Sequence, residues 1–192
     1  MLFNLEFDSG SVIEGYVVPD GFSEQPGVRV LEDGVELAAF DCARMIEAVV
    51  QSGRHESGLV GFRVDAGVVP DIAARPRLTI LDRKSGLLIY RRPQSEQTVR
   101  KRVLRLETQL LPFRRLDRML QPHFQYWLQG AERFGEETIL QAFHLNMIDS
   151  SYVSGRLMIR SYELFIEKGL EVITLLSDPY MEMAERIYLL SR

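Results

Sequence analysis

The chain has 192 residues, 46% of them hydrophobic and 26% charged, with a formal net charge of −4, which is typical of a globular protein and excludes a disordered or fibrous chain. No apolar run reaches the roughly 18 residues that a membrane-spanning helix needs. The first ten residues carry acids where a secretory signal carries bases, so we expect a cytoplasmic protein without a transmembrane segment.

Charge is segregated along the chain. Residues 1–90 carry 14 acidic and 8 basic side chains, residues 91–118 carry 3 acidic and 9 basic, and residues 119–192 carry 10 acidic and 6 basic. The overall acidity argues against non-specific binding of nucleic acid, because such binding needs an extended basic face. Arginine outnumbers lysine 20 to 3, which is typical of a protein encoded in a GC-rich bacterial genome.

The first ninety residues have the pattern of β-structure. Apolar and polar residues alternate along 3–7, and Asp33-Gly34 between two such runs is a strong hairpin signal. A second hairpin is expected around 82–86, and a single helical turn at 45–50. About seven short strands at spacings near 8 to 12 residues predict an antiparallel β-sandwich, with a closed barrel as the alternative. The expected strands are 3–7, 12–18, 27–31, 35–40, 59–64, 78–81 and 87–90.

Part of this region resembles a known type of domain. The runs IEGYVVPD at 13–20, PGVRVLEDGVELA at 26–38 and GLVGF at 58–62 are similar to β-sandwich accessory segments attached to bacterial polysaccharide enzymes. The resemblance covers about residues 12–63. It departs from the family pattern at Arg44-Met45-Ile46, where those segments carry Arg-x-Asp, so it implies a sandwich fold and a polysaccharide context but assigns no functional residue.

From residue 93 onward the spacing of apolar residues becomes helical. Val99, Val103, Leu106 and Leu110 form one stripe, which predicts a basic amphipathic helix over 97–111. The sequence therefore predicts an α+β protein, with a β-sandwich domain at 1–92 and a mainly α-helical domain at 93–192. Arg192 fits a natural C-terminus or the end of a fragment of a longer protein. The other expected elements are helices at 116–120, 122–130, 136–147, 151–168 and 180–190, and a strand at 170–176.

Signatures of catalysis are absent from the sequence. It has no glycine-rich phosphate loop, no nucleophile elbow and no His-Glu-x-x-His, so we expect no catalytic residue, no cofactor and no bound metal. The single cysteine, Cys42, excludes an internal disulfide and is interpreted as a small core residue. His123 and His144 stand beside aromatic residues and are interpreted as hydrogen-bonded histidines of aromatic patches, not as catalytic bases.

Two groups of residues remain as candidates for a binding site. The first is basic and is expected to bind an anion or a partner, although a solvated helix face is the simpler interpretation. Its Arg-Arg pair resembles that of cyclic-dinucleotide receptors of the PilZ type, whose second motif is absent here. The second group is an aromatic patch that is expected to be buried. The groups are Arg91, Arg92, Arg100, Lys101, Arg102 and Arg105, and Phe124, Tyr126 and Trp127.

The segment EVITLLSDPYMEMAER at 171–186 is similar to the strand–loop–helix of sulfotransferases that runs through Leu-Leu-Arg-Asp-Pro into a helix. In those enzymes the arginine binds a nucleotide phosphate, and Ser177 stands at that position here. The resemblance therefore implies a degenerate or truncated enzyme of this kind as an alternative function.

The absence of catalytic motifs favours a non-catalytic interaction or accessory module, linked to bacterial envelope polysaccharide production. The basic segment lies between two acidic ones, so the favoured partner is a second copy of the chain or another protein. A regulator that responds to an anion or a cyclic dinucleotide through the basic helix is the second alternative.

Overall fold

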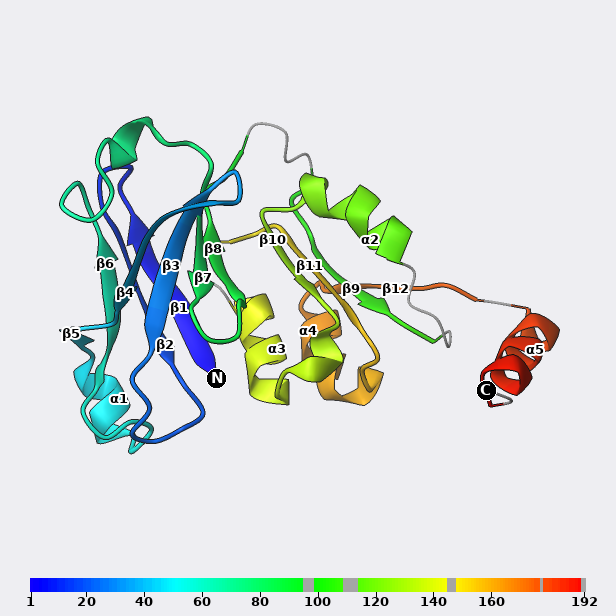
Figure 1. Cartoon of the computed structure of the whole chain (residues 1–192). Coiled ribbons are helices and arrows are strands. Elements are labelled where there is room, and N and C mark those ends of the chain that lie inside the picture. The colour runs from blue at the N-terminus through cyan, green and yellow to red at the C-terminus, as the bar shows by residue number, and fades with distance from the viewer. Residues whose placement is uncertain (95–98, 109–113, 145–147, 177, 191–192) are drawn as a thin grey trace.

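The computed structural model describes residues 1–94, 99–108, 114–144, 148–176 and 178–190 (Figure 1). Within these residues the protein is a mixed α/β structure with two antiparallel sheets, one parallel sheet and five α-helices. None of the described helices is long and apolar enough to cross a membrane.

Sheets A and B are antiparallel and are formed by the first 91 residues. Sheet A has the strand order β1-β2-β6-β5 and sheet B the order β4-β3-β7-β8. A short helix, α1 (Glu47–Gln51), follows β5 at the position of the expected helical turn. The strands of sheet A are β1 (Leu2–Asp8), β2 (Ile13–Val18), β5 (Arg44–Met45) and β6 (Leu59–Val64), and those of sheet B are β3 (Gly27–Glu32), β4 (Val35–Asp41), β7 (Leu78–Asp82) and β8 (Leu88–Arg91).

The two expected hairpins are present. Asp33 and Gly34 join β3 to β4 with φ angles of 49° and 82°, the positive values that a tight two-residue hairpin turn requires. The loop 83–87 joins β7 to β8. Sheets A and B contribute to one hydrophobic core, since Phe3, Ile13 and Phe62 of sheet A and Val28 and Ile80 of sheet B are all at most 1% exposed.

Sheet C is parallel and has the strand order β10-β11-β9-β12. Helices follow its strands along the chain, as expected for parallel strands that need long crossover connections. The strands are β9 (Arg102–Leu106), β10 (Tyr126–Gln129), β11 (Ser151–Gly155) and β12 (Glu171–Thr174), and the helices are α2 (Arg114–Leu120), α3 (Glu136–His144), α4 (Glu163–Glu167) and α5 (Pro179–Leu190).

The second half, which was expected to be mainly helical, therefore also contains the parallel sheet C, and several of the expected helices are strands. The segment 97–111, which was predicted to be a helix, contains β9, a central strand of sheet C. Val103 and Leu104 belong to core clusters on the two faces of the sheet, and both are buried. A strand buried on both faces loses the alternating pattern, so its apolar residues matched a helical spacing by coincidence. Leu110, the last residue of the expected stripe, lies outside the described residues.

Other expected helices are also replaced or shortened. Residues 122–130 contain β10, and residues 151–168 contain β11 followed by a short α4. The helices at 116–120, 136–147 and 180–190 are confirmed as α2, α3 and α5, although Met147 lies outside the described residues. The strand at 170–176 is confirmed as β12. Gly169 follows α4 with a φ of +95°, which is the left-handed conformation favoured after a helix C-terminus.

One hydrophobic core runs through both halves of the chain. The ring of Phe3 on β1 stacks on that of Tyr126 on β10, with 6.2 Å between the ring centroids. Helix α3 packs against β1, and the Thr138 hydroxyl donates a hydrogen bond of 2.9 Å to the carbonyl of Met1. Edge strands β8 and β10 lie side by side, and Leu88, Ile89 and Tyr90 are all buried there. Sheets B and C are therefore fixed relative to each other.

Candidate functional site

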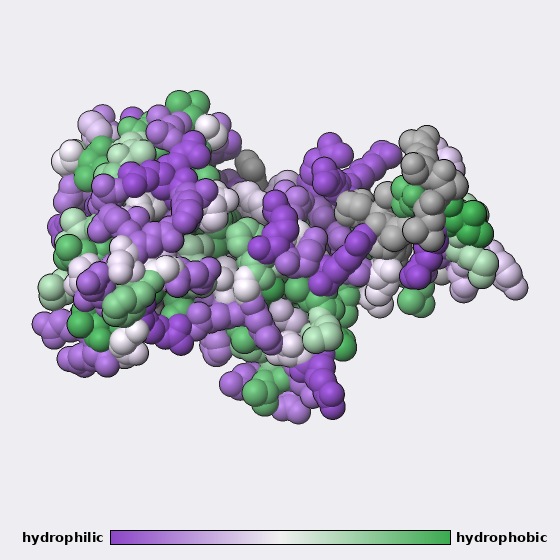
Figure 2. All heavy atoms as spheres, turned by 60° about the horizontal axis from the view of Figure 1, so that its bottom comes forward, coloured by the Kyte–Doolittle hydropathy of each residue, from purple (hydrophilic) through white to green (hydrophobic). Residues whose placement is uncertain are grey.

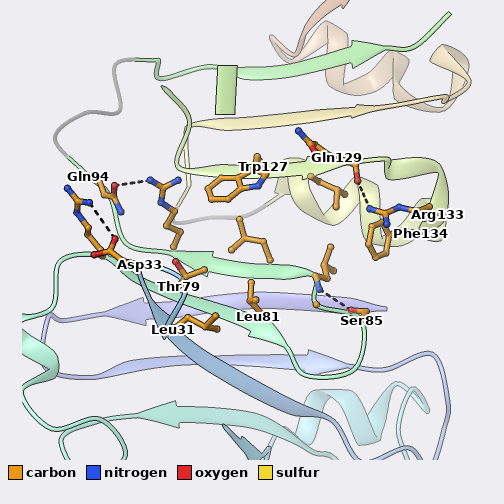
Figure 3. A pocket seen from close by; sticks show the side chains of 17 residues that line it. Leu31, Asp33, Thr79, Leu81, Ser85, Gln94, Trp127, Gln129, Arg133 and Phe134 are labelled. Atoms are coloured by element: carbon orange, nitrogen blue, oxygen red, sulfur yellow. Dashed lines mark hydrogen bonds and ion pairs between the residues drawn. The ribbon is translucent and has the colours of Figure 1, made fainter. Parts of the chain in front are cut away.

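A groove with a volume of about 650 Å³ opens between sheet B and β10, the edge strand of sheet C (Figure 3). Strands β3, β7 and β8 and their turns form one wall. Strand β10 forms the other, together with Arg133, the last residue of the short helical turn at 131–133, and Phe134 after it. The groove therefore exists only because the two parts of the chain pack together.

Strand alternation explains the aromatic wall of the groove. Successive side chains of a strand point to opposite faces. On β10, Tyr126 enters the core beside Phe3, and Trp127 turns toward the groove (Figure 3). The guanidinium carbon of Arg91 lies over Trp127, 4.7 Å from the ring centroid, and Arg91 Nη2 donates to Gln94 Oε1 at 2.8 Å. The result is a flat aromatic ring covered by a cation.

A second arginine and aromatic ring stand at the other end of the groove. The guanidinium carbon of Arg133 lies 5.6 Å from the ring centroid of Phe134, and Arg133 Nη2 donates to the carbonyl of Gln129 at 3.0 Å. A third arginine, Arg77, pairs with Asp33 at 3.4 Å. The lining side chains therefore carry three guanidinium groups and one carboxylate, so the groove favours an anion.

Arg92, the neighbour of Arg91, points away from the groove into the protein. Its Nε lies 2.8 Å from Asp8 Oδ2, and it also donates to the carbonyls of Gly10, Ile72 and Arg75. Burial alone would raise the pKa of Asp8, but hydrogen bonds from Arg92, from the Gly10 N–H and from the Tyr90 hydroxyl lower it below its usual range. Arg92 therefore joins β8 to the β1–β2 turn.

The other four residues of the expected basic group, in and just before β9, lie in different surroundings. Arg100 and Lys101 are exposed, and the Lys101 ammonium pairs with Glu171 at 2.6 Å. Arg102 is half-buried, and Arg105 is completely buried. Because alternate residues of β9 face opposite sides of the sheet, the structure does not bring these side chains together at one surface.

Arg105 belongs to a buried ionic network beneath α2. Its Nε and Nη2 donate to the two carboxylate oxygens of Asp117 at 2.9 and 2.8 Å, and Nη2 also donates to Glu107 at 2.6 Å. The Tyr152 hydroxyl donates to Asp117 at 2.7 Å, and burial raises the pKa of that phenol. The remaining nitrogen of Arg105, Nη1, has no partner among the described residues.

This network borders a second, smaller hollow of about 350 Å³. Glu107 after β9 and Gly130 after β10 line it, so it lies at the carboxyl ends of these parallel strands. Ligands of open α/β sheets bind outside such ends. The charged lining side chains are of both signs, three carboxylates and two guanidinium groups: Glu107, Asp117, Glu132, Arg114 and Arg133.

The expected aromatic patch is divided among three surroundings. Phe124 packs on Tyr152, with 5.3 Å between ring centroids, Tyr126 lies in the main core, and Trp127 lines the groove. Phe124 and Tyr126 are buried, and Trp127 is only partly so.

The single cysteine lies in the core, as the sequence predicts. Cys42 is buried in the core, and burial raises the pKa of its thiol to about 12. Within the residues that the structure describes, no three His, Cys, Asp or Glu side chains gather as metal ligands would.

Several groove residues were missed by sequence reasoning. Arg77 and the consecutive Arg133 and Phe134 come from two separate segments, and each looks like an ordinary surface residue in its own local pattern. Only the packing of β10 beside β8 brings them to Arg91 and Trp127. No family model, curated protein or solved structure matches this chain.

Proposed function

We propose that the protein is a non-catalytic, cytoplasmic accessory module that binds an acidic polysaccharide chain in the groove between sheets B and C. The observation that carries the proposal is the pairing of Trp127 with Arg91 in a groove whose lining holds three arginines and one acid. Within this module, we propose that sheets A and B act as the β-sandwich that the strand spacing predicts. The resemblance of residues 12–63 to accessory segments supports a role in bacterial envelope polysaccharide production.

The groove offers the types of group that acidic sugars need. The Trp127 ring, with Arg91 over one of its faces, supplies an apolar surface beside a cation, and the apolar C–H face of a sugar ring can pack on such an aromatic surface. The planar guanidinium groups of Arg91 and Arg133 match the geometry of a carboxylate or sulfate. The side-chain amide of Gln94 carries both donor and acceptor atoms, as sugar hydroxyls require. A volume of about 650 Å³ lies within the range of small-molecule sites, which fits a few sugar units.

The small number of carboxylates in the groove favours binding without hydrolysis. Most glycoside hydrolases act with two carboxylates on either side of the scissile bond. Among the described residues that line the groove, Asp33 alone carries a carboxylate, and it pairs with Arg77.

Trp127 makes the proposal directly measurable, because it is the only tryptophan in the chain. Titration with a sulfated tetrasaccharide should change its fluorescence, and the neutral tetrasaccharide of the same length should not. Arg91→Gln and Arg133→Gln should each weaken binding about tenfold, the loss expected for one charge-assisted hydrogen bond. Arg63→Gln on β6 is the matched control, since Arg63 is exposed and pairs with Glu14 and Asp65 outside the groove.

Equal binding by the wild type and both groove variants would overturn the proposal, as would an unchanged Trp127 signal at saturating oligosaccharide. A cyclic dinucleotide is included as a competitor. Tight binding of that nucleotide alone would favour the regulatory alternative instead.

The parallel sheet C favours a second candidate, a degenerate sulfotransferase-like enzyme. Strand β12 ends at Thr174 and α5 begins at Pro179, which is the strand–loop–helix order that the resemblance of 171–186 implies. The hollow at the carboxyl ends of β9 and β10 is a suitable place for a ligand of such a sheet. Ser177 lies outside the described residues. Binding of adenosine 3′,5′-bisphosphate that persists in Arg91→Gln would support this candidate over the groove.

A further inference from the structure

Helix α5 is an amphipathic helix whose apolar side is not covered. Figure 1 shows it apart from sheet C, and none of its residues 179–189 is buried. Tyr180 is 81% exposed, Met183 58% and Ile187 63%, and these three residues lie on one face of the helix. Figure 2 shows hydrophobic side chains at this end of the molecule. Glu182 and Arg186 lie beside this face and pair at 2.7 Å.

A helix of this kind needs a partner surface. Isolated helices of about 12 residues are marginal in water, and most of their stability in proteins comes from packing an apolar face. Helix α5 spans 12 residues and has no such packing in the single chain that the structure describes.

A surface that suits α5 lies on sheet C. Strand β12 is an edge strand, and its Ile173 pairs in register with Arg105. In-register residues of neighbouring parallel strands point to the same face, so Ile173 lies on the face that bears α2, whose Asp117 holds Arg105. Ile173 is 38% exposed, and Met119 of α2 is 63% exposed. Among the described residues, β12 therefore presents one exposed apolar side chain, and α2, which lies on the same face of sheet C, presents another.

The charges of the two surfaces are complementary. Arg115 and Arg118 are exposed on α2, and Arg100 is exposed just before β9, where the neighbouring Lys101 already pairs with Glu171 of β12. The segment 178–190 holds three acids, Asp178, Glu182 and Glu185, and one base, Arg186.

We propose that α5 of each chain docks on the α2-bearing face of β12 in a second copy, so that two chains exchange helices in a twofold dimer. The chain leaves β12 away from its own sheet face, and the Thr108 hydroxyl holds this exit by a hydrogen bond of 2.9 Å to the carbonyl of Leu175. The acceptor surface of each copy therefore stays open to the helix of the other. Reciprocal exchange covers both apolar surfaces at once, and short connections of this kind favour it.

Sedimentation of the full chain tests the dimer. The wild type should be a dimer at low salt and should dissociate more readily as salt rises, because salt screens exposed charges. Ile187→Glu should raise the dimer dissociation constant at least about tenfold, since it places a charge in the apolar contact. Phe22→Glu is the matched control, because Phe22 is a similarly exposed apolar residue, 54% exposed, in the turn after β2. A wild type that stays monomeric at every concentration would overturn the proposal.

Disulfide trapping tests the exchange itself. One preparation carries Ile173→Cys and another carries Ile187→Cys, and the two are mixed and oxidised. Cys42 does not compete, because it is 1% exposed and burial raises the pKa of its thiol to about 12. A disulfide between the two different variants supports exchange. Disulfides only between two Ile187→Cys chains would show that the helices pair with each other. A third preparation carries both substitutions in one chain, and a disulfide within its monomers would show that α5 folds back on its own sheet. Either result would overturn the proposal.

Discussion

Arg105 of β9 and Asp117 of α2 form a bidentate ion pair, with N–O distances of 2.9 and 2.8 Å, that is buried between the helix and sheet C. Both side chains are almost fully buried, at 0% and 4% exposure. The Tyr152 hydroxyl of β11 completes the contact, so one polar group joins two strands of the sheet to the helix that covers them. These hydrogen bonds fix the position of α2, because a shift of the helix would leave the buried polar groups among apolar neighbours without hydrogen-bond partners.

Asp117→Asn should destabilise the protein by about 1–3 kcal/mol, because it removes one of the two buried carboxylates that pair with Arg105 and leaves Glu107 as the remaining counterion. Urea unfolding followed by circular dichroism measures the loss. Asp65→Asn is the matched control, because its pair with Arg63 is exposed and its loss should be small. If the two variants unfolded at the same urea concentration, the buried pair would have no role in stability.

The pair of Asp8 and Arg92 should make stability depend on pH. The pKa of Asp8 is lowered in the fold, so ionised Asp8 stabilises the protein above the unfolded value of about 3.9. That stabilisation is lost as the pH falls through the folded pKa. Asp8→Asn should therefore be less stable than the wild type at pH 7, and the difference should shrink below about pH 4. Urea unfolding at both pH values measures it, with the exposed Asp71→Asn as a control. A difference that is constant with pH would contradict the prediction.

Gly15 of β2 should not tolerate a side chain. A Cβ at this position would meet the carbonyl oxygen of Asn4 on β1 and lie 2.7 Å from Cζ of Phe62 on β6. Gly15→Ala should cost about 1–3 kcal/mol, since both neighbours belong to packed strands. Gly135→Ala is the control, because no atom lies within 4 Å of its Cβ position. Thermal unfolding compares the two, and equal melting temperatures would show that sheet A adjusts freely.

Cys42 should react with thiol reagents only when the protein opens. Its side chain is buried, and burial raises the pKa of the thiol to about 12, so thiolate is scarce at neutral pH. Labelling should be slow in native buffer and fast in urea. Rapid labelling of the native protein would mean that the β3–β4 region opens often.

The sequence by itself determined the elements whose patterns are local. The alternation along β1, the Asp33-Gly34 turn and the amphipathic spacing of α3 and α5 each need only neighbouring residues to form, and all are present. Arg91 was also a candidate from the sequence, as part of the basic group, and Trp127 was one as part of an aromatic patch that was expected to be buried. The presence of the two antiparallel sheets followed from strand spacing and turn residues.

Only the tertiary structure decided the rest. Residues 102–106 became a strand because pairing with β11 and β12 buries both of their faces, and that pairing depends on residues about fifty to seventy positions away. Arg92 and Arg105 became structural because Asp8 and Asp117 meet them across the fold. The groove arises from the packing of β10 against β8, and no local pattern encodes that contact. The sequence therefore determined which segments could form, and long-range burial and charge pairing decided which side chains remained at the surface.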